Sequence, residues 1–163
     1  MEDDNAMVAG LRVVLDLEGV TLGHFVHMTV IQMKKLVISL QDVNPFRIKG
    51  THYINVPQGF DMFLNGIKSL LNEKYRSRIF VHNRNYDDLY NYIPKKILPE
   101  EYGGNGGVVK EIIDQWKRRI SDYSDWLDDD MQYRTDESKR PGKPKTAEDI
   151  FGINGSFRQL QFD

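Results

Sequence analysis

Residues 45–82, with the sequence PFRIKGTHYINVPQGFDMFLNGIKSLLNEKYRSRIFVH, decide the fold of this chain. Near the start and at the end of this stretch, residues 47–56 and 78–82 are short apolar runs that are typical of buried strands. Between these runs, Pro57-Gln58-Gly59 opens a segment whose apolar residues recur every three or four positions, which predicts an amphipathic helix. A strand, a helix and a strand in this order predict parallel pairing with a right-handed crossover.

The alternation of strands and helices continues on both sides of this stretch. Residues 11–17 are another apolar run, and the apolar spacing predicts a helix over residues 22–40 with Thr21 as its N-cap. The segments expected downstream are a short helix, a loop and a long amphipathic helix, at residues 86–93, 98–107 and 108–127. The pattern predicts an α/β fold, with a mainly parallel sheet flanked by helices.

Composition narrows the possible functions. The 163 residues, 40% hydrophobic and 28% charged, are ordinary for a globular domain, and a net charge of −2 gives no general basic field for nucleic acid. The chain has no cysteine, which excludes disulfides and a Cys-based zinc site. It contains neither a signal-peptide pattern nor an apolar run approaching the roughly 20 residues that span a bilayer. We therefore expect a cytoplasmic protein that meets membranes transiently, at their surface.

A short motif at residues 13–21, VVLDLEGVT, permits an enzymatic interpretation. It resembles the first motif of haloacid-dehalogenase-type phosphatases, in which Asp16 would be the nucleophile and Glu18 the acid/base. Asp87 and Asp88 would then hold magnesium, but they lie within an expected helix and not at a strand end. The alternative, which we favour, is that Asp16 and Glu18 cap neighbouring backbone. We expect no catalytic residue and no cofactor.

A pair of histidines raises the question of a metal site. His24 and His27 lie about one helical turn apart and are both possible metal ligands. Two histidines do not complete a site, and no HExxH-type pattern adds a carboxylate. We expect a surface or partly packed pair and no bound metal.

Basic residues recur at alternate positions where two expected strands begin. Arg47 and Lys49 precede one strand, and Lys74, Arg76 and Arg78 precede the next. Alternate residues of a strand point to one face, and neighbouring parallel strands begin at one edge, so the five cations are expected to converge. Such a cluster can hold a multiply phosphorylated head group by charge-assisted hydrogen bonds. The alternative, exposed charges that serve solubility, is common for lysine and arginine.

Three segments together resemble one protein family. They are DLEGVTLGH at residues 16–24, the stretch at residues 45–82, and LPEEYGG at residues 98–104. Their order and spacing are similar to those of the CRAL-TRIO lipid-binding domain, especially the branch of tocopherol-transfer, retinaldehyde-binding and clavesin-like proteins. The resemblance covers roughly residues 8–127.

The resemblance implies a lobe with a hydrophobic lipid pocket between the sheet and the helices, closed by a mobile gate helix. In this chain the gate would be the helix that follows Ile54-Asn55-Val56-Pro57. The residues expected on the gate face, and at the pocket or its mouth, are Phe60, Phe63 and Ile67, with Leu22 and Val26.

The resemblance also implies a partner for the basic cluster. Phosphatidylinositol bisphosphate would bind at Arg47, Lys49, Lys74 and Arg78, whereas the resemblance assigns no role to Arg76. The expected function is non-enzymatic binding and intracellular transfer of a tocopherol, retinoid or phospholipid-like ligand, released when a phosphoinositide opens the gate. The alternative is a membrane adaptor that binds phosphoinositides without transporting cargo; the phosphatase is the third candidate.

The expected organisation is a connection at residues 1–10, a lipid-binding lobe at residues 11–127 and a polar extension at residues 128–163. Members of the family carry an N-terminal helical domain and a further strand before the one expected at residue 11. The chain is therefore expected to be N-terminally truncated. Truncation would affect retention of a lipid more than it would affect the basic cluster.

Overall fold

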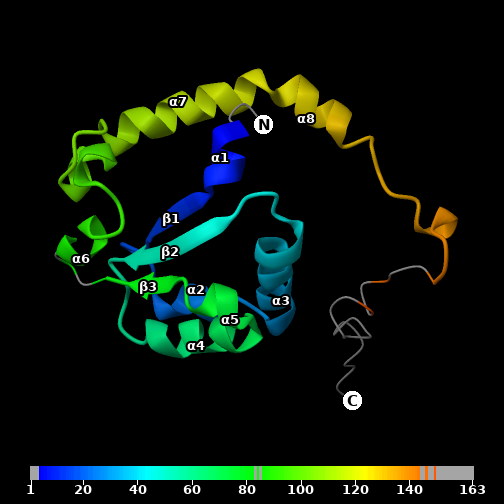
Figure 1. Ribbon diagram of the computed structural model, residues 1–163, viewed down its shortest axis with the longest axis horizontal. Coiled ribbons are helices and arrows are strands. Elements are labelled where there is room, and N and C mark those ends of the chain that lie inside the picture. Colours follow the sequence, from blue (N-terminus) through cyan, green and yellow to red (C-terminus); the bar gives the residue numbers. More distant parts are fainter. Residues whose placement is uncertain (1–3, 83, 85, 144–145, 147–148, 150–163) are drawn as a thin grey trace, which may run out of the picture. The chain divides into compact units, whose positions relative to one another are not determined.

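The first part of the chain is built around a small parallel sheet. The computed structural model describes residues 4–82, 84, 86–143, 146 and 149. The chain divides into two compact units, Met1–Val109 and Lys110–Asp163. In the first unit, helix α1 (Asp4–Ala9) precedes three parallel strands in the order β1-β2-β3, with bounds Leu11–Asp16, Ile48–Ile54 and Ile79–Val81 (Figure 1). The predicted α/β fold with a parallel sheet is confirmed.

The connection from β1 to β2 contains two helices and a π-helical turn, at Leu22–Val26 (α2), Val30–Ile38 (α3) and Ser39–Val43 (η1). The prediction of one helix over residues 22–40 is wrong. Thr29 begins a new helix, because its backbone N–H donates to Gln32 Oε1 at 2.7 Å while its hydroxyl oxygen accepts from the Gln32 N–H at 3.3 Å. This reciprocal pair is a capping box. Thr21 is the N-cap of α2, as predicted.

Two helices also connect β2 to β3. Helix α4 (Phe60–Leu70) follows Gly59, whose φ of 82° requires the left-handed region that glycine tolerates. Helix α5 (Glu73–Arg76) is a single turn, and Asn72 caps it by accepting a 3.0 Å hydrogen bond from the Tyr75 N–H. Strand β3 begins only at Ile79, so the basic residues at positions 74 and 76 lie on a helix.

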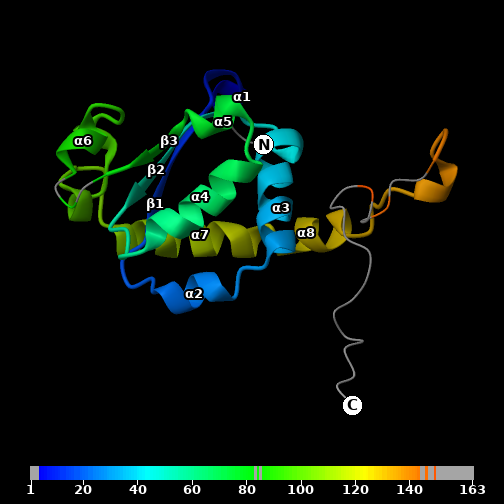
Figure 2. The same ribbon diagram turned by 90° about the horizontal axis from the view of Figure 1, so that it is seen from below.

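The sheet packs on both faces. Ile54 of β2 joins a cluster of buried residues from the segment after β3, which contains α6 (Asp87–Tyr90), η2 (Lys95–Ile97) and η3 (Glu100–Tyr102). Ile79 of β3 packs instead against a cluster from α3 and α4. Ile79 pairs with Thr51, three residues before Ile54, so the two isoleucines point to opposite faces. Figure 2 shows α6 on one side of the strands, and α3 and α4 on the other.

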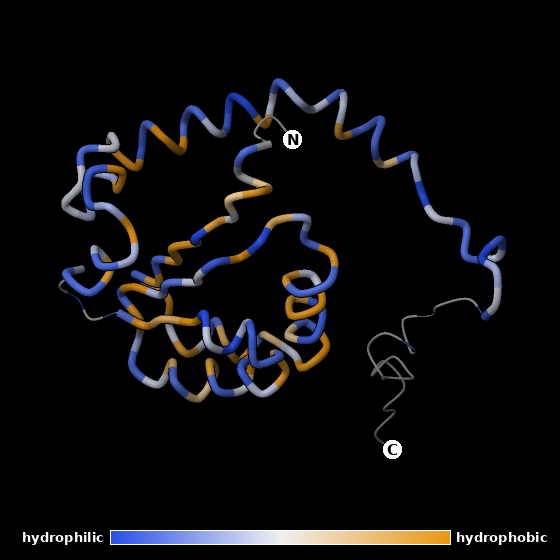
Figure 3. The backbone as a smooth tube through the Cα atoms, in the orientation of Figure 1, coloured by the Kyte–Doolittle hydropathy of each residue, from blue (hydrophilic) through white to orange (hydrophobic). Residues whose placement is uncertain are grey.

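The described part of the second unit contains helices separated by irregular segments. Helix α7 (Val109–Asp122) begins at the unit boundary, and α8 (Ser124–Asp130) and a 3₁₀ turn η4 (Glu137–Lys139) follow it. The helix predicted over residues 108–127 is interrupted at Tyr123. Hydrophobic and hydrophilic residues alternate along α7, as expected for an amphipathic helix (Figure 3). The large apolar side chains that are exposed in α7 and α8 are Ile113, Trp116, Ile120, Trp126 and Leu127.

Two expectations about the organisation of the chain are not tested by the structure. The boundaries at residues 10/11 and 127/128 remain predictions, and residues 150–163 of the expected extension lie outside the described residues. Within the described part of the chain, no helix is long and apolar enough to cross a membrane.

Candidate functional site

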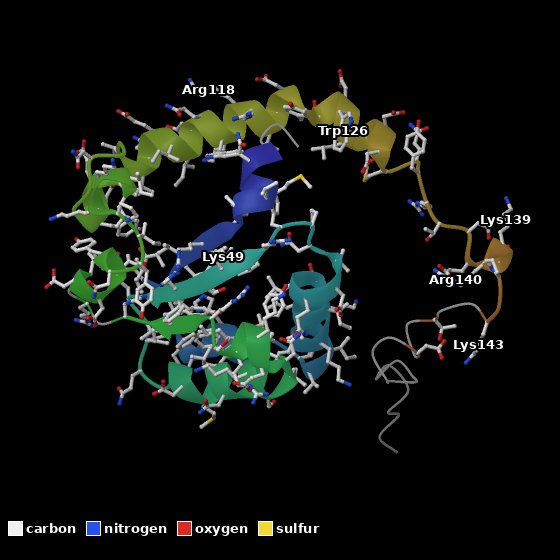
Figure 4. All side chains as sticks on the ribbon, viewed as in Figure 1. Lys49, Arg118, Trp126, Lys139, Arg140 and Lys143 are labelled. Atoms are coloured by element: carbon white, nitrogen blue, oxygen red, sulfur yellow. The ribbon has the colours of Figure 1, made fainter. Side chains whose placement is uncertain are left out.

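A pocket of about 260 Å³ lies where β2 and β3 begin. Lys49, which lies on β2 (Figure 4), is one of its lining residues. The residues that line the pocket are Phe46, Arg47, Ile48, Lys49, Lys74, Tyr75 and Arg78. The structure thus brings together four of the five basic residues that were expected to converge.

The backbone explains why these four side chains meet. Arg47 and Lys49 flank Ile48 at the first residue of β2. Arg78, the residue before β3, reaches across to β2, and its Nη1 donates a 2.6 Å hydrogen bond to the carbonyl oxygen of Ile48. Lys74 is four residues before Arg78, and Ser77 continues the right-handed helical conformation of α5, so both side chains lie on one side of this turn.

Arg76 does not join the pocket, and the expectation that five cations converge is wrong for this residue. Its Nε donates to the Lys68 carbonyl oxygen at 3.2 Å and its Nη2 to the Leu71 carbonyl oxygen at 2.9 Å. The prediction assumed strand geometry. On a helix, residues two apart are separated by about 200°, so Arg76 points away from Lys74.

The chemistry of the pocket favours an anion with several negative oxygens. Arg47, Lys49 and Lys74 are exposed and Arg78 is half-buried. None of the described residues that line the pocket is acidic, so no carboxylate neutralises the four positive charges inside it. Guanidinium and ammonium groups together offer charge-assisted hydrogen bonds to phosphate oxygens, and arginine can bind two oxygens at once.

The residues expected at a lipid pocket have different environments. Phe60 and Ile67 of α4 are 2% and 4% exposed, and Phe63 is half-buried. Leu22 of α2 is exposed, and Val26 is 81% exposed. Three of the five therefore face the interior of the protein and two face solvent.

Helix α2 nevertheless lies against the start of α4. The ring of Phe25 stacks on Phe63 with 4.4 Å between centroids and lies 5.7 Å from the ring of Phe60. A Cβ at Gly59 would be 3.1 Å from Leu22 Cδ2, so these two residues are also adjacent. The sequence reasoning missed Phe25, although its position three residues after Leu22 places both on one face of a helix.

In the phosphatase-like motif, the carboxylate of Asp16 accepts three hydrogen bonds from other residues. Asp16 Oδ1 accepts from the Glu18 N–H and from Asn55 Nδ2, both at 2.9 Å, and Oδ2 accepts from the Tyr102 hydroxyl at 2.8 Å. Burial by itself would raise the pKa of Asp16, but these three hydrogen bonds lower it. The bond from Glu18 N–H is the backbone cap that we favoured for Asp16. Asp88, with its neighbour Asp87, lies in the first turn of α6.

The paired histidines at α2 have different environments. His24 Nδ1 accepts a 3.0 Å hydrogen bond from the Thr21 N–H, which satisfies a free donor at the helix start. His27 is exposed at the C-cap of α2. Among the residues that the structure describes, no three His, Asp or Glu side chains gather as a metal-ion site would require.

A second histidine pair was missed by the sequence reasoning. His52 Nδ1 and His82 Nε2 are 2.8 Å apart, and the two residues are 0% and 5% exposed. The His52 ring packs against the rings of Phe80 and Tyr92, with centroid distances of 4.9 and 5.1 Å, and its Nε2 is 3.3 Å from Arg12 Nη1. Burial, together with the charges of His82 and Arg12, lowers the pKa of His52 to about 4. Burial also lowers the pKa of His82.

Comparison with known proteins gives a consistent result. A family model described as the CRAL/TRIO domain matches residues 1–104. A human protein named alpha-tocopherol transfer protein-like is 36% identical over 109 residues, which are 67% of this chain and 32% of that protein. Human clavesin-2 is 31% identical over 143 residues, which are 88% of this chain and 42% of clavesin-2. Rat clavesin-1 is 30% identical over 127 residues, 77% of this chain and 35% of that protein.

These matches differ in how much of each protein they cover. The chain spans about a third of the length of the alpha-tocopherol transfer protein-like relative, at 32%. The family model, in contrast, covers more than half of the chain, including all three strands and the four basic residues of the pocket. The chain therefore belongs to the CRAL/TRIO domain family.

Proposed function

We propose that this chain binds the head group of a phosphoinositide in the pocket formed by Arg47, Lys49, Lys74 and Arg78. The observation that carries the proposal is the convergence of these four cations on one pocket of about 260 Å³. A head group with several phosphates on one ring would place two or more dianions within reach of the four side chains. Anionic membranes also attract clustered basic residues by about 1 kcal/mol for each residue near the surface.

The second part of the proposal concerns a hydrophobic cargo. CRAL/TRIO domain proteins bind and transfer lipids, and one relative carries tocopherol transfer in its name. We propose that this chain carries a tocopherol, a retinoid or a phospholipid-like molecule beside α4 without covalent chemistry, in the cytoplasm, and releases it at a membrane. The amphipathic character of α4 and its internal Gly66, which weakens a helix, support a movable element.

Vesicle sedimentation tests the head-group proposal. Wild-type chain should sediment with vesicles that contain phosphatidylinositol bisphosphate, and Arg47→Glu with Lys49→Glu should abolish the sedimentation. The matched control is Lys95→Glu with Lys96→Glu, which changes the charge equally on η2, in the segment that packs near the other end of β2. The control should bind as wild type does. Equal binding by both double variants would contradict the proposal.

A specific observation favours a second candidate, an adaptor that binds phosphoinositides without cargo. Phe60 and Ile67 already have close partners within the protein, so these expected cargo contacts are occupied. Native mass spectrometry of lipids that co-purify with the chain separates the two candidates. A bound lipid of one mass class supports the carrier, and its absence from protein that still binds the vesicles supports the adaptor.

A further inference from the structure

We infer that Arg76 is a positioning residue for the anion pocket: it clamps α5 to the C-terminal end of α4 and thereby keeps Lys74 in place. The inference rests on the proposed head-group site. It assigns a role to a basic residue that lies among the pocket cations in sequence but does not line the pocket.

The clamp is visible in the hydrogen bonds of the Arg76 guanidinium. The last carbonyl groups of a helix lack the N–H partner four residues on that the other carbonyl groups have, and at this end of α4 the Lys68 carbonyl oxygen accepts a 3.3 Å hydrogen bond from the Leu71 N–H. Arg76 donates to two carbonyl oxygens at this end of α4, that of Lys68 at 3.2 Å and that of Leu71 at 2.9 Å. A planar guanidinium can bridge two acceptors, which a single ammonium cannot do with the same geometry. The exposed ion pair with Glu73, at 3.5 Å, adds little.

Helix α5 depends on such external contacts because it has only four residues. A single helical turn is not stable by itself in water. Two further contacts hold it: the Asn72 N–H donates to Gln41 Oε1 at 2.9 Å, and Tyr75 packs against the buried cluster that contains Ile67. Arg76 supplies the contact at the end of α5 from which the chain continues to β3.

Only one pocket cation relies on this clamp. Lys74 lies on α5 itself, whereas Arg47 and Lys49 lie at the start of β2. Arg78 has its own anchor, the hydrogen bond to the Ile48 carbonyl oxygen. Loss of the Arg76 clamp should therefore act on anion binding through Lys74 and leave the other three cations where they are.

A double-mutant cycle tests this route. The affinity of the full chain for vesicles with phosphatidylinositol bisphosphate is measured for Arg76→Gln, Lys74→Gln and the double variant. Arg76→Gln should weaken binding by roughly three- to tenfold, the size expected if the displaced Lys74 loses about one ordinary hydrogen bond to the anion. The same change should have almost no effect when Lys74 is already glutamine, and its full effect when Arg47 is glutamine instead. Additive losses from Arg76→Gln and Lys74→Gln would overturn the inference.

Two readouts separate positioning from contact with the ligand. Arg76→Gln should reduce the salt dependence of vesicle binding when Lys74 is present and leave it unchanged when Lys74 is glutamine, because Arg76 acts on the phosphates only through Lys74. Arg76→Lys keeps the charge but not the two-carbonyl bridge, so it should bind as weakly as Arg76→Gln. Lys96→Gln removes one charge elsewhere and should bind as wild type does. Wild-type affinity in Arg76→Lys would show that charge matters and not the clamp.

Hydrogen exchange tests the clamp independently of any ligand. The amides of Arg76 and Ser77 donate to the carbonyl oxygens of Asn72 and Glu73, both at 3.0 Å. In Arg76→Lys and Arg76→Gln these two amides should exchange faster, while amides in β2 remain protected. Unchanged exchange would overturn the clamp. Failure of wild-type chain to bind the vesicles, with faster exchange in the variants, would instead contradict the proposed function and leave the clamp established as a structural contact only.

Discussion

The hydroxyl group of Tyr102 donates a 2.8 Å hydrogen bond to Asp16 Oδ2, although 86 positions separate the two residues in sequence. This bond ties the loop that contains η3 to the carboxyl end of β1. Asn55 strengthens the connection: it holds a φ of 52° and donates through Nδ2 to Asp16 Oδ1 at 2.9 Å and to the Tyr86 hydroxyl at 3.2 Å. The network fixes the end of the sheet opposite the basic pocket.

Tyr102→Phe should lower the free energy of unfolding by about 1–2 kcal/mol, because a hydrogen bond to a charged carboxylate is lost. Urea unfolding at pH 7 measures the difference. The hydrogen bonds lower the pKa of Asp16 in the folded protein, so their stabilisation is present above the ordinary pKa and lost as pH falls through the lowered value. The difference between variant and wild type should therefore shrink in acid. Tyr133→Phe, at an exposed position, is the control and should have no effect.

The buried pair of His52 and His82 should make the protein sensitive to mild acid. Both pKa values are lowered in the folded protein, that of His52 to about 4, so protonation favours the unfolded chain. The stabilisation is fully present above the unfolded pKa of about 6.5 and is lost as pH falls from there toward 4. Arg12 opposes protonation of His52, whereas Asp88 favours that of His82. The expected loss of unfolding free energy is about 1–3 kcal/mol.

Urea unfolding at several pH values between 7.5 and 4.5 measures this loss. Replacing both buried histidines by glutamine should flatten the pH dependence in this range, whereas His27→Gln, at an exposed position, should not change it. A pH dependence that survives in the double variant would assign the acid sensitivity to other groups.

Two glycines should respond to alanine in opposite ways. A Cβ at Gly66, within α4, meets no atom within 4 Å, so alanine there should stabilise the protein by about 0.5–1 kcal/mol. A Cβ at Gly104 would collide with the carbonyl group of Leu98, so alanine there should be destabilising. Thermal unfolding of both variants measures the signs. If α4 moves during cargo release, Gly66→Ala should also slow lipid transfer between vesicles, and an unchanged transfer rate would argue against that movement.

The sequence predicted the sheet well because strand signals are local. Apolar runs at residues 11–17, 47–56 and 78–82 correspond to β1, β2 and β3, and parallel pairing follows from the helices between them. The two long helices were predicted without their interruptions. For the first, Thr29 and Gln32 carry a capping-box signal that apolar spacing alone does not register.

The basic pocket was predicted for a reason that was only half correct. Arg47 and Lys49 meet the other cations because β2 and β3 are parallel neighbours, as the sequence indicated. Lys74 and Arg78 meet them because they lie one helical turn apart, and the same geometry turns Arg76 away. A strand and a single helical turn before a strand are difficult to tell apart when the segment is mostly polar or charged, as residues 73–78 are.

The His52–His82 contact could not be predicted, because it joins β2 to the residue after β3 through side chains 30 positions apart. A partial signal was present: on a strand, position 52 lies on the same face as Ile48 and Ile54, so the His52 side chain was expected on a buried face. Burial of one histidine does not identify its partner, which depends on the register of β2 with β3.

The central claim is that Arg47, Lys49, Lys74 and Arg78 form one binding site for a phosphorylated head group. Titration of ¹⁵N-labelled chain with a soluble, short-chain phosphatidylinositol bisphosphate, followed by NMR, tests it most directly. We predict saturable shifts of amide resonances at residues 46–50 and 74–78, absent when Arg47 and Lys49 are both glutamate. Shifts confined to other residues, or equal shifts in that variant, would contradict the claim.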